Sequence, residues 1–214
     1  IWFPVVGAVV GGLAGAVIVA ASGHWSVSIA SLLGLAAAAA ITGGLHLDGF
    51  ADTLDGIGAW KGREETLRIM QDSRIGGLGA VGLVLLLLLK WAFFQQAAVD
   101  LPIRTLVAVC ALSRWSLVLS AQFFPYVPGR TGMGRLVTDA RSRKALACAC
   151  GLAAVIAFAS IGFTQGVVCL AAAGVVAWGL NRLFVARLGG MTGDTLGAVN
   201  EVVEVALLLV LTAR

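Results

Sequence analysis

Long apolar stretches, separated by short polar ones, run through the whole chain. A helix that crosses the ~30 Å hydrocarbon core of a bilayer needs about 20 mostly apolar residues. Seven stretches have about that length: Trp2–Ala21, Val27–Leu47, Gly76–Ala97, Leu101–Phe123, Ala145–Phe163, Gly166–Val185 and Leu196–Ala213. They leave no room for a second domain. The pattern therefore predicts an all-α fold, a polytopic membrane bundle of about seven transmembrane helices that forms one domain over residues 1–214.

The composition supports a lipid environment. Of the 214 residues, 59% are hydrophobic and 12% are charged, whereas soluble domains carry about 25% charged residues. This excludes a soluble enzyme, a disordered chain and a nucleic-acid binder. The 28 glycines favour close helix packing in lipid, and Gly7, Gly11 and Gly15 predict a packing seam on the first span. Because the chain opens on Ile1 without a separate signal sequence, we expect residues before Ile1 to be missing.

Basic residues indicate the orientation of the bundle. They gather in three places, after the second span, after the fourth and at the end of the sixth: Lys61, Arg63, Arg68, Arg74, Arg130, Arg135, Arg141, Arg143, Lys144, Arg182 and Arg187. In a seven-span chain these places share one face, and the opposite connections carry only Arg104. The positive-inside rule then puts segments 46–76, 125–144 and 187–204 in the cytoplasm and the C-terminus outside.

The first cluster of acidic residues continues the end of the second span. Asp48, Asp52 and Asp55 stand at positions i, i+4 and i+7, so a helix would present them on one face. Three like charges repel each other, and a bound cation relieves this repulsion. Carboxylate oxygens suit Mg²⁺, with Mn²⁺ as a substitute. A solvated acidic face is the alternative, and His46 fits either a supporting role beside the cluster or a packing role.

The second cluster opens the last span and consists of Asp194, Glu201 and Glu204. A carboxylate inside a membrane helix costs about 2.5–3.5 kcal/mol on insertion scales, so it needs a cation, a partner or a wet cavity. The structural alternative is an ion pair with Arg114. Both clusters lie at the same membrane face in the predicted topology. We therefore expect them to form a metal-lined cavity that opens to the cytoplasm.

Arginines supply the complementary charge. Arg74 lies just before the third span and Arg114 within the fourth, Arg130 belongs to the Gly-rich segment 129–134, and Arg187 precedes the second cluster. A Gly-rich loop allows the backbone to approach an anion closely. Carboxylates that hold metal and arginines that hold phosphate are typical of phosphoryl transfer.

Three stretches resemble a known family. Segments 43–56, 72–76 and 191–201 are similar to the cobalamin synthases, the adenosylcobinamide-GDP ribazoletransferases of the bacterial inner membrane, and the resemblance covers nearly the whole chain. It implies a Mg²⁺-dependent transferase that joins adenosylcobinamide-GDP to α-ribazole, or to its 5′-phosphate, with release of GMP. This is the last assembly step of cobalamin biosynthesis. In this reaction a ribose hydroxyl attacks the phosphorus on the corrinoid's aminopropanol arm.

The resemblance also implies roles for individual residues. Around the metal we expect Asp48, Asp52, Asp55, Asp194, Glu201 and Glu204. Asp48, Asp52 and Asp55 would be catalytic, with Asp55 as general base for the hydroxyl. Substrate and phosphate would be bound by Arg74, Arg130, Arg114, Arg187 and His46.

Other readings of the same residues remain open. Asp52–Ala59 fits the first half of the CDP-alcohol phosphotransferase motif, D-x-x-D-G-x-x-A, but Trp60 replaces the Arg that follows, and the second half is absent. UbiA-like prenyltransferases also pair Asp-rich helices with diphosphate, in a repeat that this chain lacks. A cation or proton transporter would use the buried acids as an ion path. The sequence predicts no nucleic-acid partner and leaves a homo-oligomer open.

Overall fold

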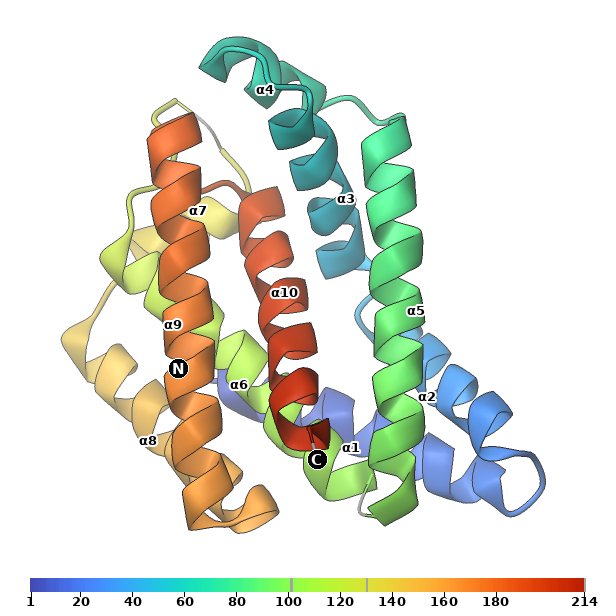
Figure 1. Cartoon of the computed structure of the whole chain (residues 1–214). Coiled ribbons are helices and arrows are strands. Elements are labelled where there is room, and N and C mark those ends of the chain that lie inside the picture. The colour runs from blue at the N-terminus through green and yellow to red at the C-terminus, as the bar shows by residue number, and fades with distance from the viewer. Residues whose placement is uncertain (101, 130, 214) are drawn as a thin grey trace.

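The computed structural model describes residues 1–100, 102–129 and 131–213, with the backbone alone at residues 100, 133 and 137. This part of the chain folds into ten α-helices. Its only extended pairing is an isolated bridge between Tyr126 and Met191. The all-α membrane fold predicted from the sequence is confirmed, and Figure 1 shows the helices arranged as one bundle.

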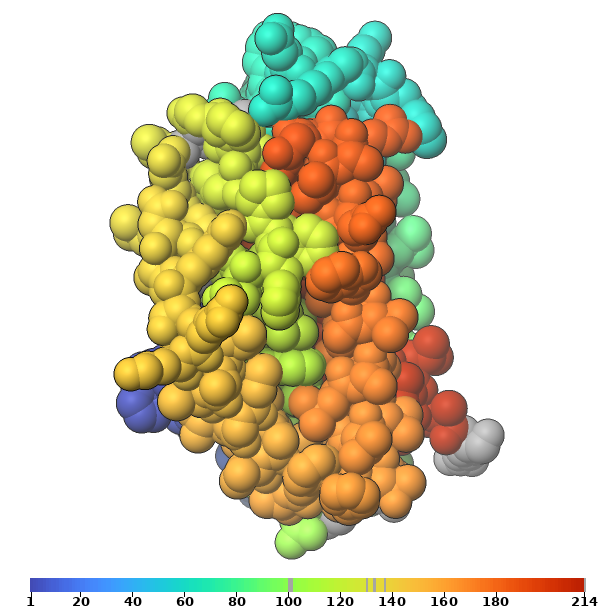
Figure 2. All heavy atoms as spheres, turned by 90° about the vertical axis from the view of Figure 1, so that its left-hand side faces the viewer, coloured from blue at the N-terminus to red at the C-terminus, as the bar shows by residue number. Residues whose placement is uncertain are grey.

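Six helices are long and apolar enough to cross a membrane. They are α1 (Phe3–Ser22), α5 (Gly77–Asp100), α6 (Pro102–Phe123), α8 (Arg143–Ile161), α9 (Phe163–Leu188) and α10 (Gly193–Thr212). The most buried of the six are α6 and α10, which form the centre of the bundle. Figure 2 shows the face on which α8 and α9 lie outermost, with part of α6 between them. Val155 of α8 and Val175 of α9 are exposed. Such a surface suits contact with lipid.

The second predicted span is bent. The helix expected over Val27–Leu47 ends early, so that α2 (Val27–Ile41) and α3 (Leu45–Gly58) meet at 87°. Gly43 and Gly44 cause the bend, because they adopt φ values of 62° and 70°, a left-handed conformation that interrupts an α-helix. Counted as one broken crossing, the pair brings the total to seven.

Short elements cover the end of the bundle at which α3 lies (Figure 1). They are the helices α4 (Arg63–Ile69) and α7 (Met133–Asp139). The loop after α6 is tied to the loop before α10 by two backbone hydrogen bonds: the Val127 N–H donates to the Met191 carbonyl at 2.9 Å, and the Met191 N–H donates to the Pro125 carbonyl at 2.8 Å. These bonds place the Gly-rich segment beside the second acidic cluster.

The glycine seam predicted on the first span is confirmed. Gly7, Gly11 and Gly15 pack against the backbone of α6, and a Cβ atom added at any of them would overlap that backbone. On the same helix Gly12 has room, since its added Cβ would lie 3.5 Å from the Val107 side chain. The two helices can therefore approach each other closely only along the row of glycines.

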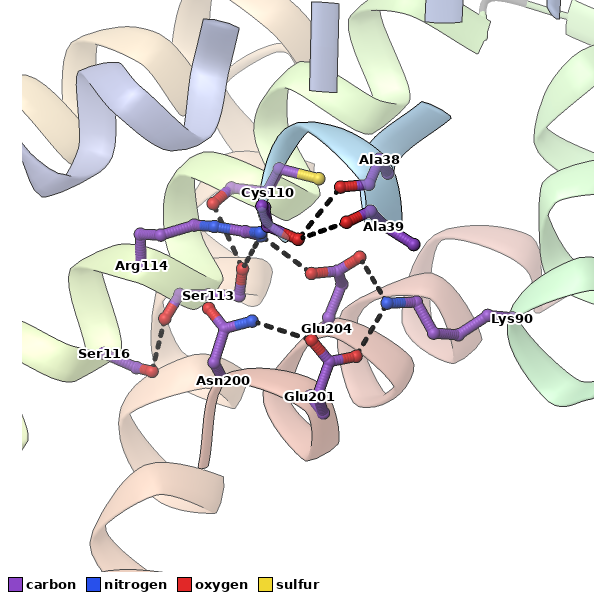
Figure 3. A network of polar contacts seen from close by, with 11 residues as sticks. Ala38, Ala39, Lys90, Cys110, Ser113, Arg114, Ser116, Asn200, Glu201 and Glu204 are labelled. Carbon is purple, nitrogen blue, oxygen red and sulfur yellow. Dashed lines mark hydrogen bonds and ion pairs between the residues drawn. The ribbon is translucent and has the colours of Figure 1, made fainter. Parts of the chain in front are cut away.

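A buried ion network lies between three helices (Figure 3). Lys90 of α5 binds Glu201 at 2.7 Å and Glu204 at 3.0 Å, both on α10, and Arg114 of α6 binds Glu204 at 2.8 Å. All four side chains are at most 6% exposed. The Asn200 amide also donates to Glu201. Two positive and two negative charges thus balance one another within the bundle.

We expect the Gly11→Ala variant to lose about 1–3 kcal/mol of stability, because overpacking a tight interface forces the backbones apart. Thermal unfolding in detergent should show a lower midpoint for Gly11→Ala and an almost unchanged midpoint for Gly12→Ala. Equal effects of the two variants would contradict the close approach of α1 and α6.

The Lys90→Met variant should be destabilised by about 3–5 kcal/mol, since it leaves buried carboxylates without full compensation. The control is Arg68→Met, which removes the exposed ion pair between Arg68 and Glu65 and should leave the unfolding midpoint unchanged. Unfolding in detergent followed by tryptophan fluorescence would measure both. A stable Lys90→Met protein would show that the network contributes little to folding.

Candidate active site

The two predicted acidic clusters meet where α3 crosses α10. A Cβ added to Gly49 of α3 would lie 2.8 Å from the Asp194 Cα atom, and one added to Gly197 of α10 would lie 3.1 Å from the His46 carbonyl oxygen. Only glycine permits this approach. It brings Asp52 within electrostatic reach of Asp48, Asp194 and Asp55.

The start of α10 places Asp194 at this crossing. Thr192 and Thr195 form a capping box, in which the Thr192 hydroxyl accepts the Thr195 N–H at 3.1 Å and the Thr195 hydroxyl accepts the Thr192 N–H at 2.8 Å. Such a cap satisfies two of the free N–H groups at a helix start. Asp194 consequently lies in the first turn of α10, beside α3.

A cavity of about 790 Å³ opens beside the crossing. Asp48 and His46 line it from α3, and Asp194 lines it from α10. Its wall also includes Tyr126 and, from the Gly-rich segment, Gly129, Thr131, Gly132 and Gly134. The apolar side chains of Phe3, Leu45, Met70, Leu117 and Leu196 complete it. Residues of both acidic clusters and of the Gly-rich segment thus line one cavity. Arg130 lies outside the described residues.

His46 lies between this cavity and the ion network. Its side chain is half-buried, and the buried Nδ1 atom has no hydrogen-bond partner among the described residues. His46 is also within electrostatic reach of Arg114, Glu204 and Lys90. The imidazole ring thus borders the cavity and holds a buried nitrogen that has no hydrogen-bond partner among the described residues.

Asp55 differs from the other carboxylates of α3. Its Oδ2 atom accepts the Gly76 N–H and its Oδ1 atom accepts the Gly79 N–H, each at 2.7 Å. These amides belong to the start of α5, and Asp55 does not line the cavity. Both of its oxygens are therefore engaged by the backbone.

Glu201 and Glu204 belong to the ion network and do not line the cavity. The structure thus contains the arrangement that the sequence left as an alternative, with Arg114 paired to Glu204. Sequence reasoning missed Lys90. A single lysine within the apolar run 77–99 was an available signal, because a charge inside a membrane helix needs a partner.

The remaining predicted arginines lie away from the cavity lining. Arg74 forms an exposed ion pair with Asp72 at 2.7 Å, and its hydrogen bonds lower the pKa of the Asp72 carboxyl to about 2. The Arg187 guanidinium lies 4.7 Å from the centre of the Trp60 ring, a cation–π contact. Arg63, which the sequence did not single out, donates to the Leu188 carbonyl at 2.7 Å and so caps the end of α9.

The described residues contain no group of three or more His, Cys, Asp or Glu side chains that could hold a metal ion. Mg²⁺, however, is commonly bound through one or two carboxylates together with substrate phosphates and water. Asp48 and Asp194 face the same cavity, and Asp52 lies close to both. These three side chains fit such a shared site, whereas Glu201 and Glu204 already hold cationic side chains.

Proteins named adenosylcobinamide-GDP ribazoletransferase are similar to the chain over nearly its whole length. The protein from Herpetosiphon aurantiacus is 38% identical over 99% of this chain and 84% of its own. The Roseiflexus protein is 37% identical over 99% and 78%, and that of Klebsiella pneumoniae is 37% identical over 98% and 85%.

No solved structure matches the chain. The family model described as cobalamin-5-phosphate synthase matches residues 1–212. Because this match covers almost every residue, including both carboxylate helices and the Gly-rich segment, the chain belongs to the cobalamin-5-phosphate synthase family.

Proposed function

We propose that this protein joins adenosylcobinamide-GDP to α-ribazole, or to its 5′-phosphate, and releases GMP. The main support for the proposal is the cavity lined by Asp48 and Asp194. The chain's relatives are named as this transferase. A hydroxyl of the ribose forms a bond to the phosphorus on the aminopropanol arm. The bond from that phosphorus to the GMP oxygen breaks, and the hydroxyl proton is released.

The chain's own groups suit this chemistry. The carboxylates of Asp48, Asp52 and Asp194 would hold Mg²⁺ together with the pyrophosphate, and the ion would supply positive charge against the phosphate oxygens. The backbone around Gly129 and Gly132 can approach the phosphates closely. The apolar wall at Phe3 and Leu117 offers surface to the corrinoid.

The cavity would face the cytoplasm of a bacterial inner membrane. Segments 61–74 and 135–141 and the end of α9 lie at the cavity end of the bundle and together carry most of the basic residues, whereas Arg104 lies in the first turn of α6, which begins at the opposite end. Excess Lys and Arg is typical of cytoplasmic loops. Both substrates would therefore reach the cavity directly from the cytoplasm.

The direct test is a turnover assay of the full chain in nanodiscs. Adenosylcobinamide-GDP is combined with α-ribazole or its 5′-phosphate, with and without Mg²⁺, and mass spectrometry identifies the products. We expect the joined cobamide and GMP to appear only with the metal. Folded protein that forms no product with either ribazole would overturn the proposal.

The Asp52→Asn variant should lose turnover by about 100-fold or more while it remains folded, because it removes a negative charge that would hold the metal ion, and the ion in turn would neutralise the phosphates. Glu64→Gln is the matched control: Glu64 is an exposed carboxylate in the first turn of α4 and its change to the amide should leave turnover intact. Normal activity of Asp52→Asn would remove α3 from the site.

A further inference from the structure

The helix α5 contacts both carboxylate-bearing helices, α3 and α10, yet contributes no residue to the cavity lining among the described residues. The three helices also lie together in Figure 1. Since α3 and α10 must hold their carboxylates at a set separation around one ligand, the helix that both of them touch can determine that separation.

The first attachment joins α3 to the start of α5. The N–H groups in the first turn of a helix have no partner within the helix, and they carry partial positive charge. The Asp55 carboxylate accepts two of these N–H groups, from Gly76 and Gly79, at 2.7 Å each. Charge-assisted bonds of this kind fix the direction as well as the distance of the carboxylate.

Two glycines of this turn leave room for the Asp55 carboxylate. A Cβ atom added at Gly76 or at Gly79 would collide with the Asp55 carboxylate, whereas a Cβ added at Gly77 would meet no atom within 4 Å. Farther along α5, a Cβ at Gly82 would collide with the Leu54 side chain. The surface of α5 is thus shaped to receive α3 on one side only.

The second attachment joins α10 to α5 at a deeper level. Lys90 lies eleven residues after Gly79, about 16 Å farther along the helix. Its ammonium group lies between Glu201 and Glu204 (Figure 3). Glu201 follows Asp194 by seven residues, which is about two helical turns, so the two lie on the same side of α10.

We propose that Asp55 and Lys90 are positioning residues, which hold α3 and α10 against α5 so that Asp48, Asp52 and Asp194 face one cavity. This inference rests on the proposed function, because it assigns roles within the same site. It separates Asp55 from the two neighbouring carboxylates of its helix. Asp55 takes no part in binding metal or in accepting the substrate proton.

Replacement of Asp55 by asparagine or by leucine distinguishes a positioning role from a catalytic or metal-binding role. The asparagine amide oxygen still accepts one of the two N–H groups, so Asp55→Asn should keep kcat within about 10-fold and the midpoint of Mg²⁺ activation within about twofold of the unmodified protein. Asp55→Leu should lower kcat by about 100-fold, because both bonds are lost. Asp52→Asn, measured in parallel, should lose turnover even at saturating Mg²⁺.

Two outcomes would overturn the proposal. A loss of kcat of about 1,000-fold in Asp55→Asn at an unchanged unfolding temperature would place Asp55 among the reacting groups. Full activity of Asp55→Leu would show that the attachment of α3 to α5 does not position the carboxylates of the cavity. If Asp55→Leu does not fold, Gly79→Ala replaces it, since its methyl group displaces the carboxylate, and Gly77→Ala is its control. We expect a lower kcat for Gly79→Ala and an unchanged kcat for Gly77→Ala.

A separate pair of variants, Lys90→Arg and Lys90→Met, tests the role of Lys90. Lys90→Arg retains the charge and should recover most of the kcat that Lys90→Met loses at a temperature where both proteins are folded, with the KM for adenosylcobinamide-GDP unchanged in both. Equal kcat for Lys90→Met and the unmodified protein would remove Lys90 from the proposal.

Hydrogen–deuterium exchange separates this inference from the proposed function. In Asp55→Leu the amides of Gly76 and Gly79 should exchange about 10-fold faster, whether or not the protein makes a cobamide. If the unmodified protein makes no cobamide but these amides exchange faster in Asp55→Leu, only the proposed function is overturned. Unchanged exchange at these amides would overturn the attachment itself, even in an active enzyme.

Discussion

A charge inside a membrane protein needs a partner, and this requirement separates the acidic residues of the chain into two groups. Glu201 and Glu204 are buried between Lys90 and Arg114, where each negative charge is balanced. Burial of the four groups is tolerable only because they are paired. Asp48 and Asp194 instead line a cavity that opens out of the bundle. Carboxylates of the second kind can serve a ligand, because they face open space.

Glycine provides the close contacts that make this arrangement possible. Gly7, Gly11 and Gly15 bring α1 against α6, the helix that carries Arg114, while Gly49 and Gly197 bring α3 against α10. Helices in lipid associate through packing rather than through exclusion of water, so small residues at their contacts matter more than in soluble proteins. The left-handed Gly43 and Gly44 then turn α3 away from α2. Without that bend, the carboxylates of α3 would not reach α10.

In the proposed function, the metal would be held by the protein and the substrate together. The described residues supply carboxylates from two helices, a Gly-rich segment and an apolar wall, without a set of three or more ligands that could hold a metal by itself. Such an arrangement suits a divalent cation that arrives with phosphate. It also agrees with a family whose named members act on a nucleotide-linked corrinoid.

The sequence alone determined the membrane class, the approximate spans, the glycine seam of α1 and the two acidic clusters, because hydropathy, spacing and the cost of a charge in lipid are local properties. Only the tertiary structure decided which carboxylates face the cavity. The i, i+4, i+7 spacing placed Asp55 with Asp48 and Asp52, yet its oxygens bind amides more than twenty residues away. Likewise, Lys90 and Glu201 are 111 residues apart. Their pairing depends on how separate helices pack, which periodicity along one helix does not contain.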